Sequence, residues 1–232
     1  MSLFSIFITF ALATALLVLW GKWRQAARAN YIRHYAFPPG LFDKLRRKRP
    51  ELTLKDCQLV GQALRQFFLA YLHSGCKFVS MPSQVVDDLW HELILYTRHY
   101  ELFCNQAFGR FMHHTPAVVL SADRQNNTGL RRCWWYACKE ENIHPKQPTR
   151  LPLLFALDSK LGIADGYAYV PDCNGTPRRL GDQSGSSTVY CGGDFSDASV
   201  DGSTDGFGDS VSGDGSDGGD GGCGGGCGGG GD

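Results

Sequence analysis

The sequence predicts a mainly α-helical chain with three parts: an N-terminal transmembrane helix, a small helical bundle, and a disordered tail rich in Gly and Asp. An uncharged, mostly apolar run fills residues 3–20, and Gly, Ser and Asp dominate from about residue 180 onward. Between these segments, apolar residues recur at helical spacing. We therefore predict an anchor at residues 1–21, a basic juxtamembrane helix at 22–36, a helical domain at 37–180 and a tail at 181–232.

The apolar run has the length and the flanks of a membrane anchor. As a helix, residues 3–20 would span roughly 27 Å, close to the thickness of the hydrocarbon core. A cleaved signal peptide would carry its positive charges before the apolar run, whereas here Lys22 and Arg24 follow it. Trp20 and Trp23 stand where interfacial aromatic residues are common. The positive-inside rule then predicts a single-pass membrane protein with its globular domain in the cytoplasm.

Charge is distributed unevenly along a chain that is neutral overall. Residues 22–49 contain nine basic residues and one acidic residue, whereas residues 192–232 contain nine aspartates and no Lys or Arg. We expect residues 22–49 to contact anionic lipid headgroups. The alternatives are a topology signal followed by a solvated loop, or a surface onto which the acidic tail folds back. No nucleic-acid partner is predicted, because the basic run at residues 44–49 lacks interleaved aromatic residues and is expected to lie against the membrane.

Helix-end signals and apolar periodicity predict four helices in the domain, with little sheet. The sequence Phe-Pro-Pro-Gly at 37–40 ends the basic helix, because Pro lacks an amide donor. Thr53 and Asp56 have the spacing of a capping box, and Ser83 is a good N-cap for the next helix. The predicted helices cover residues 53–73, 83–107, 128–141 and 153–161, followed by a short extended piece at 167–170.

The cysteines favour reduced thiols in a cytoplasmic setting, because all nine are scattered without the framework of a disulfide scaffold. Two of them, Cys223 and Cys227, lie in polyglycine near the C-terminus. The tail has too little apolar surface to offset the entropy of ordering. In such a segment the two thiols could capture a soft metal, form a labile disulfide or be modified; a low-complexity linker is the alternative.

A set of residues in the middle of the chain forms a family signature. It comprises Met81-Pro82-Ser83, Asp88-Leu89-Trp90-His91, Tyr100, Phe103-Cys104, Gly109 and His113-His114-Thr115-Pro116. Together with the Gly-rich C-terminus, this signature resembles that of the glycine-rich domain-containing proteins of plants and bacteria. The resemblance covers residues 37–116 and the tail, and it implies a fold more than an activity. Some plant members are described with an RNA-binding segment, but this chain lacks the aromatic run that such binding uses.

Several residues of this signature are of types that bind zinc. On one continuous helix, His91 and Cys104 would lie roughly 20 Å apart and could not share an ion. Cys104 also falls on the apolar stripe of that helix. We therefore predict that Cys104 is a buried structural thiol.

A metal site could instead form around His91. Asp87 and Asp88 precede it by about one turn and could orient its ring or supply a carboxylate ligand. His113 or His114 could return to it through a short extended segment. The alternative is a structural polar cluster in which Asp88 and His91 hydrogen-bond each other. The candidate ligands are thus Asp88, His91, His113 and His114, with Cys223 and Cys227 as a separate pair in the tail, and zinc is the candidate cofactor.

The sequence contains no complete catalytic set: there is no phosphate-binding glycine loop, no nucleophile elbow and no H-E-x-x-H motif. We therefore expect a non-enzymatic, membrane-tethered helical module that presents its acidic, thiol-bearing tail to an unidentified protein partner or to a metal. The rival hypothesis is a metal-dependent enzyme or metal-binding protein centred on Asp88, His91 and His113.

Overall fold

The computed structural model describes residues 3–114, 128–171 and 189–195, and over these residues the chain is mainly helical, as predicted. The helices are α1 (Leu3–Arg33), α2 (Leu41–Lys48), α3 (Leu54–His73), α4 (Gln84–Ile94), α5 (Thr97–Ala107), α6 (Thr128–Glu140) and α7 (Leu153–Leu161). Two strands, β1 (Ala168–Val170) and β2 (Val189–Cys191), and a 3-10 helix, η3 (Gly192–Phe195), follow. The helices predicted at 53–73, 128–141 and 153–161 are confirmed as α3, α6 and α7.

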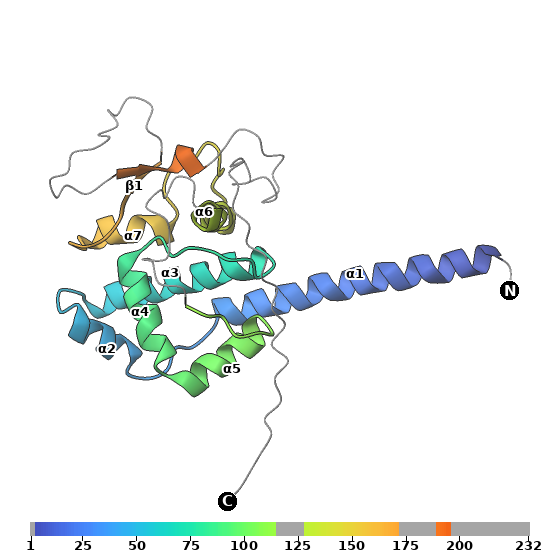
Figure 1. Cartoon of the computed structure of the whole chain (residues 1–232), viewed down its shortest axis with the longest axis horizontal. Coiled ribbons are helices and arrows are strands. Elements are labelled where there is room, and N and C mark those ends of the chain that lie inside the picture. Colours follow the sequence, from blue (N-terminus) through green and yellow to red (C-terminus); the bar gives the residue numbers. More distant parts are fainter. Residues whose placement is uncertain (1–2, 115–127, 172–188, 196–232) are drawn as a thin grey trace, which may run out of the picture.

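Helix α3 runs through the centre of the domain (Figure 1). It contacts α1, α4, α6 and α7, and most of its side chains are buried, including Phe67 and Phe68. Each such side chain contributes about 1.5–3 kcal/mol when it is removed from water. Thr53 and Asp56 form the predicted capping box: the Asp56 amide donates to Thr53 Oγ1, and the Asp56 carboxylate accepts from the Thr53 amide.

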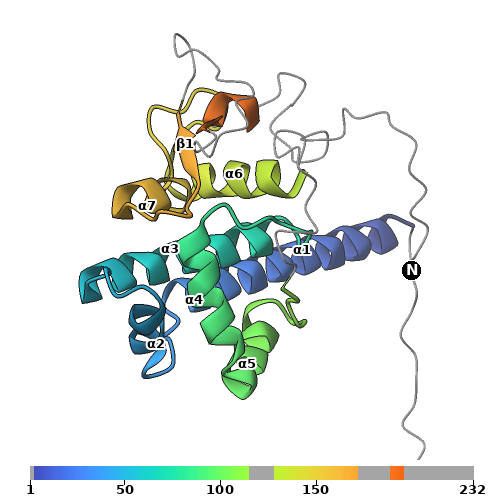
Figure 2. The same ribbon diagram turned by 60° about the vertical axis from the view of Figure 1, so that its left-hand side comes forward.

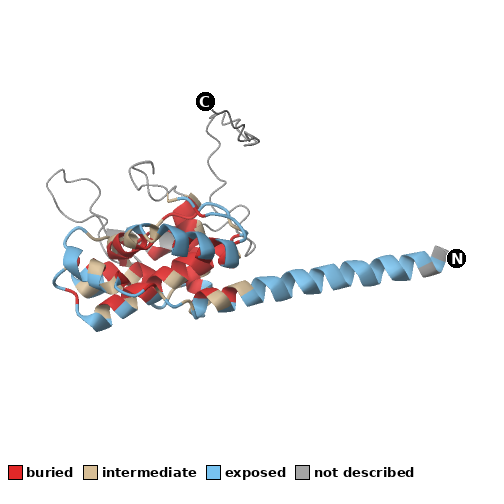
Figure 3. Cartoon of the chain, turned by 90° about the horizontal axis from the view of Figure 1, so that it is seen from below, coloured by how far each residue is buried: buried red, intermediate tan, exposed pale blue. Residues whose placement is uncertain are grey.

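Helix α1 lies partly inside the domain and partly outside it. It is continuous from Leu3 to Arg33, and its segment Ile6–Arg33 is long and apolar enough to cross a membrane. Every residue at positions 6–27 is exposed, whereas Ala29 and Ile32 are buried in the core (Figure 3). The packed domain therefore begins before the predicted boundary at residue 37, because the last turns of the juxtamembrane helix supply core residues.

The helix predicted at residues 83–107 is two helices, α4 and α5, which meet at Leu95 and Tyr96. Tyr96 leaves helical geometry with ψ at 58°, and its hydroxyl donates to the Pro39 carbonyl at 3.2 Å. The Lys44 ammonium lies 4.3 Å from the centre of the Tyr96 ring. Because no Pro or Gly marks this position in the sequence, we attribute the break to these contacts with the turn before α2 and with α2 itself.

The packed domain also extends past the predicted boundary at residue 180. Strand β1 lies at the predicted extended piece and pairs in parallel with β2. In η3, the fully buried Phe195 packs against Trp134, Phe155 and Tyr169. Phe195, an aromatic residue within a Gly- and Asp-rich stretch, thus completes the hydrophobic core at this end of the domain. Disorder was predicted for residues 181–232, but residues 189–195 form β2 and η3, and residues 181–188 and 196–232 lie outside the described residues.

Candidate metal centre

Three potential metal ligands meet beside α4. Asp87 and His91 belong to α4, and His114 reaches them from the segment after α5. Asp87 Oδ1 lies 2.9 Å from His114 Nε2, and Asp87 Oδ2 lies 3.5 Å from His91 Nδ1. One ligand atom from each residue lies within 4.8 Å of the other two. Atoms that bind one zinc ion at about 2 Å stand ~3–3.5 Å apart, so small side-chain rotations would bring the group to coordinating distance.

The local sequence of α4 explains why two ligands share one face. Ser83 is the N-cap, as predicted, and its hydroxyl accepts from the Val86 amide at 3.3 Å. Asp87 and His91 are separated by one helical turn, which places their side chains on the same side of the helix. Val86 and Leu89 are buried in the core. The packing of these apolar residues therefore turns the ligand pair outward.

A buried carboxylate from α7 holds the start of α4 in place. Asp158 is 2 % exposed, and its Oδ1 accepts from the Ser83 hydroxyl at 2.6 Å and from the Val85 amide at 3.2 Å. Its Oδ2 accepts from the amides of Gln84 at 2.7 Å and Tyr167 at 2.9 Å. A negative charge at a helix N-terminus is stabilised by the helix dipole. Asp158 thus anchors the helix that carries two of the three ligands.

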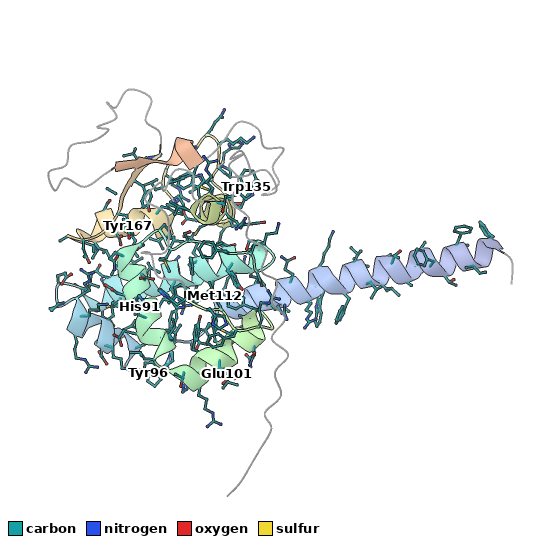
Figure 4. All side chains as sticks on the ribbon, viewed as in Figure 1. His91, Tyr96, Glu101, Met112, Trp135 and Tyr167 are labelled. Carbon is teal, nitrogen blue, oxygen red and sulfur yellow. The ribbon has the colours of Figure 1, made fainter. Side chains whose placement is uncertain are left out.

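The position of His114, the third ligand, depends on how the chain returns after α5; Figure 4 labels Met112 in this return segment and His91 on α4. Gly109 has a φ of 73°, a left-handed conformation that suits glycine at a helix end. The buried Tyr100 hydroxyl donates to the Met112 carbonyl at 2.7 Å and accepts from Trp90 Nε1 at 3.1 Å. The His114 ring lies 4.5 Å from the Trp90 ring, measured between centroids. Trp90, Tyr100 and Gly109 belong to the family signature. They therefore position His114, although none of them is itself a metal ligand.

Two of the predicted ligands are engaged elsewhere. Asp88 is buried, and its carboxylate pairs with Lys48 at 2.6 Å and with Arg49 at 2.8 Å. His113 is exposed, and its ring lies 4.9 Å from that of Phe111. Neither residue belongs to the group of three. The carboxylate in that group is instead Asp87, the other acidic residue one turn before His91.

The ligand set leaves coordination positions open. The side chains of Asp87 and His114 are 16 % and 13 % exposed, whereas that of His91 is 46 % exposed. Two imidazoles and one carboxylate form a three-ligand set, which in catalytic zinc sites and in non-haem iron sites is completed by water or substrate. An ion held here would be reachable from solvent.

Four of the described cysteines, Cys57, Cys104, Cys133 and Cys138, are buried in the core and do not belong to this site. Cys104 is a buried free thiol, as predicted, and burial raises its pKa. Burial also raises the pKa of Cys57, and that of Cys138 to about 12. A protonated thiol is neither a good ligand nor a good nucleophile. The two tail cysteines, Cys223 and Cys227, lie outside the described residues.

The last part of the basic segment forms a helix that was not predicted, α2, and the end of this helix is tied to the domain by ion pairs. Besides its bond to Asp88, Arg49 donates to both oxygens of Asp165, at 2.6 and 2.7 Å. The hydrogen bond to Asp165 raises the pKa of Arg49, and the same bond holds the pKa of Asp165 below its usual value. Figure 2 shows α2 at the end of the domain away from the projecting part of α1. Lys48 and Arg49 therefore serve as structural cations.

A polar cleft of about 770 Å³ is lined by side chains of α1, α3, α6 and α7, together with Glu141. Two of its lining residues cap the N-terminus of α7, which has no cap of its own. Gln66 Oε1 accepts from the Leu154 amide at 2.9 Å, and Glu141 Oε1 accepts from the Leu153 amide at 2.6 Å. Gln66 of α3 and Glu141, which follows α6, thus supply the N-terminal caps that α7 lacks.

Comparison with known proteins agrees with these domain limits. No curated protein and no solved structure matches the chain. A family model described as UCP032817-like matches residues 27–195, which is most of the chain. The match starts where α1 enters the core and ends with Phe195 of η3. The chain therefore belongs to the UCP032817-like family.

Proposed function

We propose that this protein is a membrane-anchored metal-binding protein whose domain holds one divalent transition-metal ion between Asp87, His91 and His114. The observation that carries the proposal is the convergence of three ligand atoms from two separate segments to within 4.8 Å. The ring of His114 is further supported by Trp90, and such supporting contacts are typical of metal sites. The nitrogen and oxygen ligands suit zinc first, with iron and manganese as the competing ions.

The anchor is the second part of the proposal. Helix α1 exposes an apolar surface, including Phe7, Leu16 and Leu17, that none of the described residues of the domain covers. Such a surface is stable in a bilayer and costly in water. Lys22 and Arg24 follow it and support a cytoplasmic position for the domain. Resistance of the full-length protein to alkaline carbonate extraction would support insertion, and reporter fusions after residue 195 would test the orientation.

The open coordination positions support a role in which the ion contacts water or a substrate, because structural zinc sites in proteins have four protein ligands. This favours a metal-dependent reaction over a purely structural ion. The expectation of a module that presents its tail to a partner depends on residues 196–232, which lie outside the described residues. The resemblance to the glycine-rich domain-containing proteins stays a prediction that rests on the signature.

Metal analysis of the purified full-length protein tests the site. After incubation with Zn²⁺ and removal of excess metal, we expect one equivalent of zinc per chain. Asp87→Asn and His114→Ala should lower the affinity for zinc by roughly 100-fold or more, since even supporting residues of metal sites contribute 10- to 100-fold.

The adjacent histidine provides the matched control. His113→Ala removes a histidine next in sequence to the ligand, and it should leave zinc binding unchanged because His113 lies outside the group of three. Absence of bound zinc, iron and manganese from the wild type would refute the proposal. If His113→Ala lost the metal and His114→Ala kept it, the ligand assignment would be wrong.

A further inference from the structure

The polar cleft between α1, α3, α6 and α7 is large enough to hold a small organic molecule. Most of its lining belongs to α3, where Gln58, Gln62 and Arg65 recur at about one-turn spacing and share one face. Figure 2 shows α3 between α1 on one side and α6 and α7 on the other, so these helices supply the walls. Its volume of about 770 Å³ lies within the roughly 300–1,000 Å³ that is usual for small-molecule sites.

The two carboxylates that line the cleft are already paired. Glu140 accepts from Arg33, from Nε at 2.7 Å and from Nη2 at 2.8 Å. Glu141 accepts from Gln66 Nε2 at 2.9 Å and forms an ion pair with Arg150. Each carboxylate therefore has its own arginine, and neither is left to neutralise a further cation of the cleft.

Arg65 is a half-buried cation that these pairs leave over. Its Nε and Nη2 atoms donate to the Tyr35 carbonyl at 3.1 and 2.7 Å, and its guanidinium carbon lies 4.5 Å from the centre of the Phe37 ring. Among the described residues, no carboxylate pairs with it. Burial lowers the pKa of Arg65, as expected for a cation removed from water without an anion beside it. A guanidinium has five N–H donors, so three remain for a ligand.

The neighbouring glutamines complete a polar binding surface. Gln58 and Gln62 are exposed, and within the described part of the chain neither makes a side-chain hydrogen bond. Each amide can both donate and accept, so the pair suits hydroxyl or amide groups of a ligand. Leu59 and Leu69 add apolar surface for its carbon atoms.

The number of free charges favours a carboxylate over a phosphate. The end of a guanidinium forms two parallel hydrogen bonds with one carboxylate, and one positive charge balances one negative charge. A phosphate group carries about −1.5 to −2 charge and is typically met by a cluster of arginines. In this cleft Arg33 is engaged with Glu140, and only Arg65 has no anionic partner among the described residues.

The length of α1 indicates that the ligand comes from solution. Arg33 follows Trp20 by thirteen residues of unbroken helix, which is about 20 Å along the axis. If the hydrocarbon core ends near Trp20, a tilt of ~40° still leaves about 15 Å between it and the cleft. The headgroup region is only roughly 5–8 Å thick. Lipid headgroups therefore do not reach Arg65.

We propose that this cleft binds a small, water-soluble organic carboxylate. Arg65 holds the carboxylate group, and Gln58 and Gln62 hold hydroxyl or amide groups of the same molecule. The site shares no residue with the group formed by Asp87, His91 and His114, so it goes beyond the proposed metal binding and does not depend on it.

Phenylglyoxal, which reacts with arginine side chains, tests the proposal on the metal-free full-length protein in non-ionic detergent. Peptide mass spectrometry after timed labelling gives the reaction rate of Arg65. The probes are gluconate, which has one carboxylate and several hydroxyls, and N-acetylglycine, which has one carboxylate and one amide. Each should slow the reaction saturably, by about 10-fold at roughly ten times its Kd. We expect half-protection at about 1–10 mM, and none from sodium chloride at equal ionic strength.

Three controls locate the effect. Arg47 is exposed on α2, and its reaction rate in the same samples should stay unchanged. Gln62→Ala should raise the concentration for half-protection by roughly 2–10-fold, because one hydrogen bond to the ligand is lost. Gln106→Ala changes an equally exposed glutamine on α5 and should have no effect. N-acetylglycinamide, the neutral counterpart of N-acetylglycine, should not protect Arg65.

Several results would overturn the proposal. An Arg65 that does not react shows that its remaining donors do not face the cleft. Absence of saturable protection by both carboxylates up to about 50 mM, well above the expected Kd, removes the ligand. Equal protection by N-acetylglycinamide, or protection by inorganic phosphate alone, shows that the ligand class is wrong. Equal shifts for Gln62→Ala and Gln106→Ala place the binding elsewhere.

Discussion

Replacement of Asp158 by Asn tests how the start of α4 is held. The substitution keeps the size of the side chain but replaces one acceptor oxygen by an NH2 donor. The new side-chain amide can adopt two orientations. In the more favourable one its NH2 group takes the place of Oδ1, and the Ser83 hydroxyl rotates to accept a hydrogen bond from it. The Val85 amide, which donates to Oδ1 in the native protein, is then left without its acceptor inside the core.

The expected loss of stability follows from these bonds. The bonds from Gln84 and Tyr167 to Oδ2 survive as neutral hydrogen bonds, which are weaker than bonds to a charged group by about 1 kcal/mol each. The unpaired Val85 amide costs about 1–3 kcal/mol. Loss of the negative charge at the helix N-terminus costs a further ~0.5 kcal/mol. Relief of the desolvation of the carboxylate offsets part of this sum, so we expect a net destabilisation of about 2–4 kcal/mol.

Urea unfolding of the full-length protein in detergent, followed by tryptophan fluorescence, measures this change. With a slope of about 2 kcal/mol per molar, the midpoint should fall by roughly 1–2 M while the slope stays constant. Asp165→Asn is the control, because this carboxylate is 55 % exposed and pairs at the surface. It should cost less than about 1 kcal/mol. A loss below about 0.5 kcal/mol for Asp158→Asn, or equal losses for the two variants, would refute the role given to Asp158.

Three further outcomes are expected. Tyr100→Phe removes the hydroxyl that holds the Met112 carbonyl, and in zinc titrations it should weaken binding by roughly 10-fold, although neither residue is a ligand. The pKa of Asp165 is lowered in the folded state, so its pair with Arg49 stabilises the fold fully above the unfolded-state pKa of 3.8, and this stabilisation is lost as the pH falls through the lower folded-state pKa. Asp165→Asn should remove this pH-dependent part of the free energy of unfolding, measured by urea unfolding between about pH 5 and pH 2. Because burial raises the pKa of Cys138 to about 12, alkylation of this thiol at about pH 8 should follow global unfolding, as peptide mass spectrometry after timed labelling would show.

Elements with strong local signals were predicted within one or two residues. Helix α3 has a capping box and a long apolar stripe, and both are properties of neighbouring residues. Helix α7 is bounded by Pro152 and Gly162, and β1 follows soon after. Such signals need no information from the rest of the chain.

Elements that depend on distant contacts were missed. The break between α4 and α5 is attributed above to the contact of Tyr96 with Pro39, 57 residues away in the sequence. The order at residues 189–195 depends on Phe195, which is buried against the rings of Trp134, Phe155 and Tyr169. The composition of that stretch, taken alone, is that of a disordered segment.

The sequence by itself determined that an exposed apolar helix precedes a helical domain, and that histidines and a carboxylate could meet near His91. The tertiary structure decided which residues meet. Adjacent residues on a helix point about 100° apart, so Asp87 and Asp88 cannot both face the same neighbours. Because Lys48 and Arg49 of the α2 segment hold Asp88, Asp87 is the carboxylate beside His91. The Tyr100 bond to the return segment likewise brings His114 to this group and leaves His113 exposed.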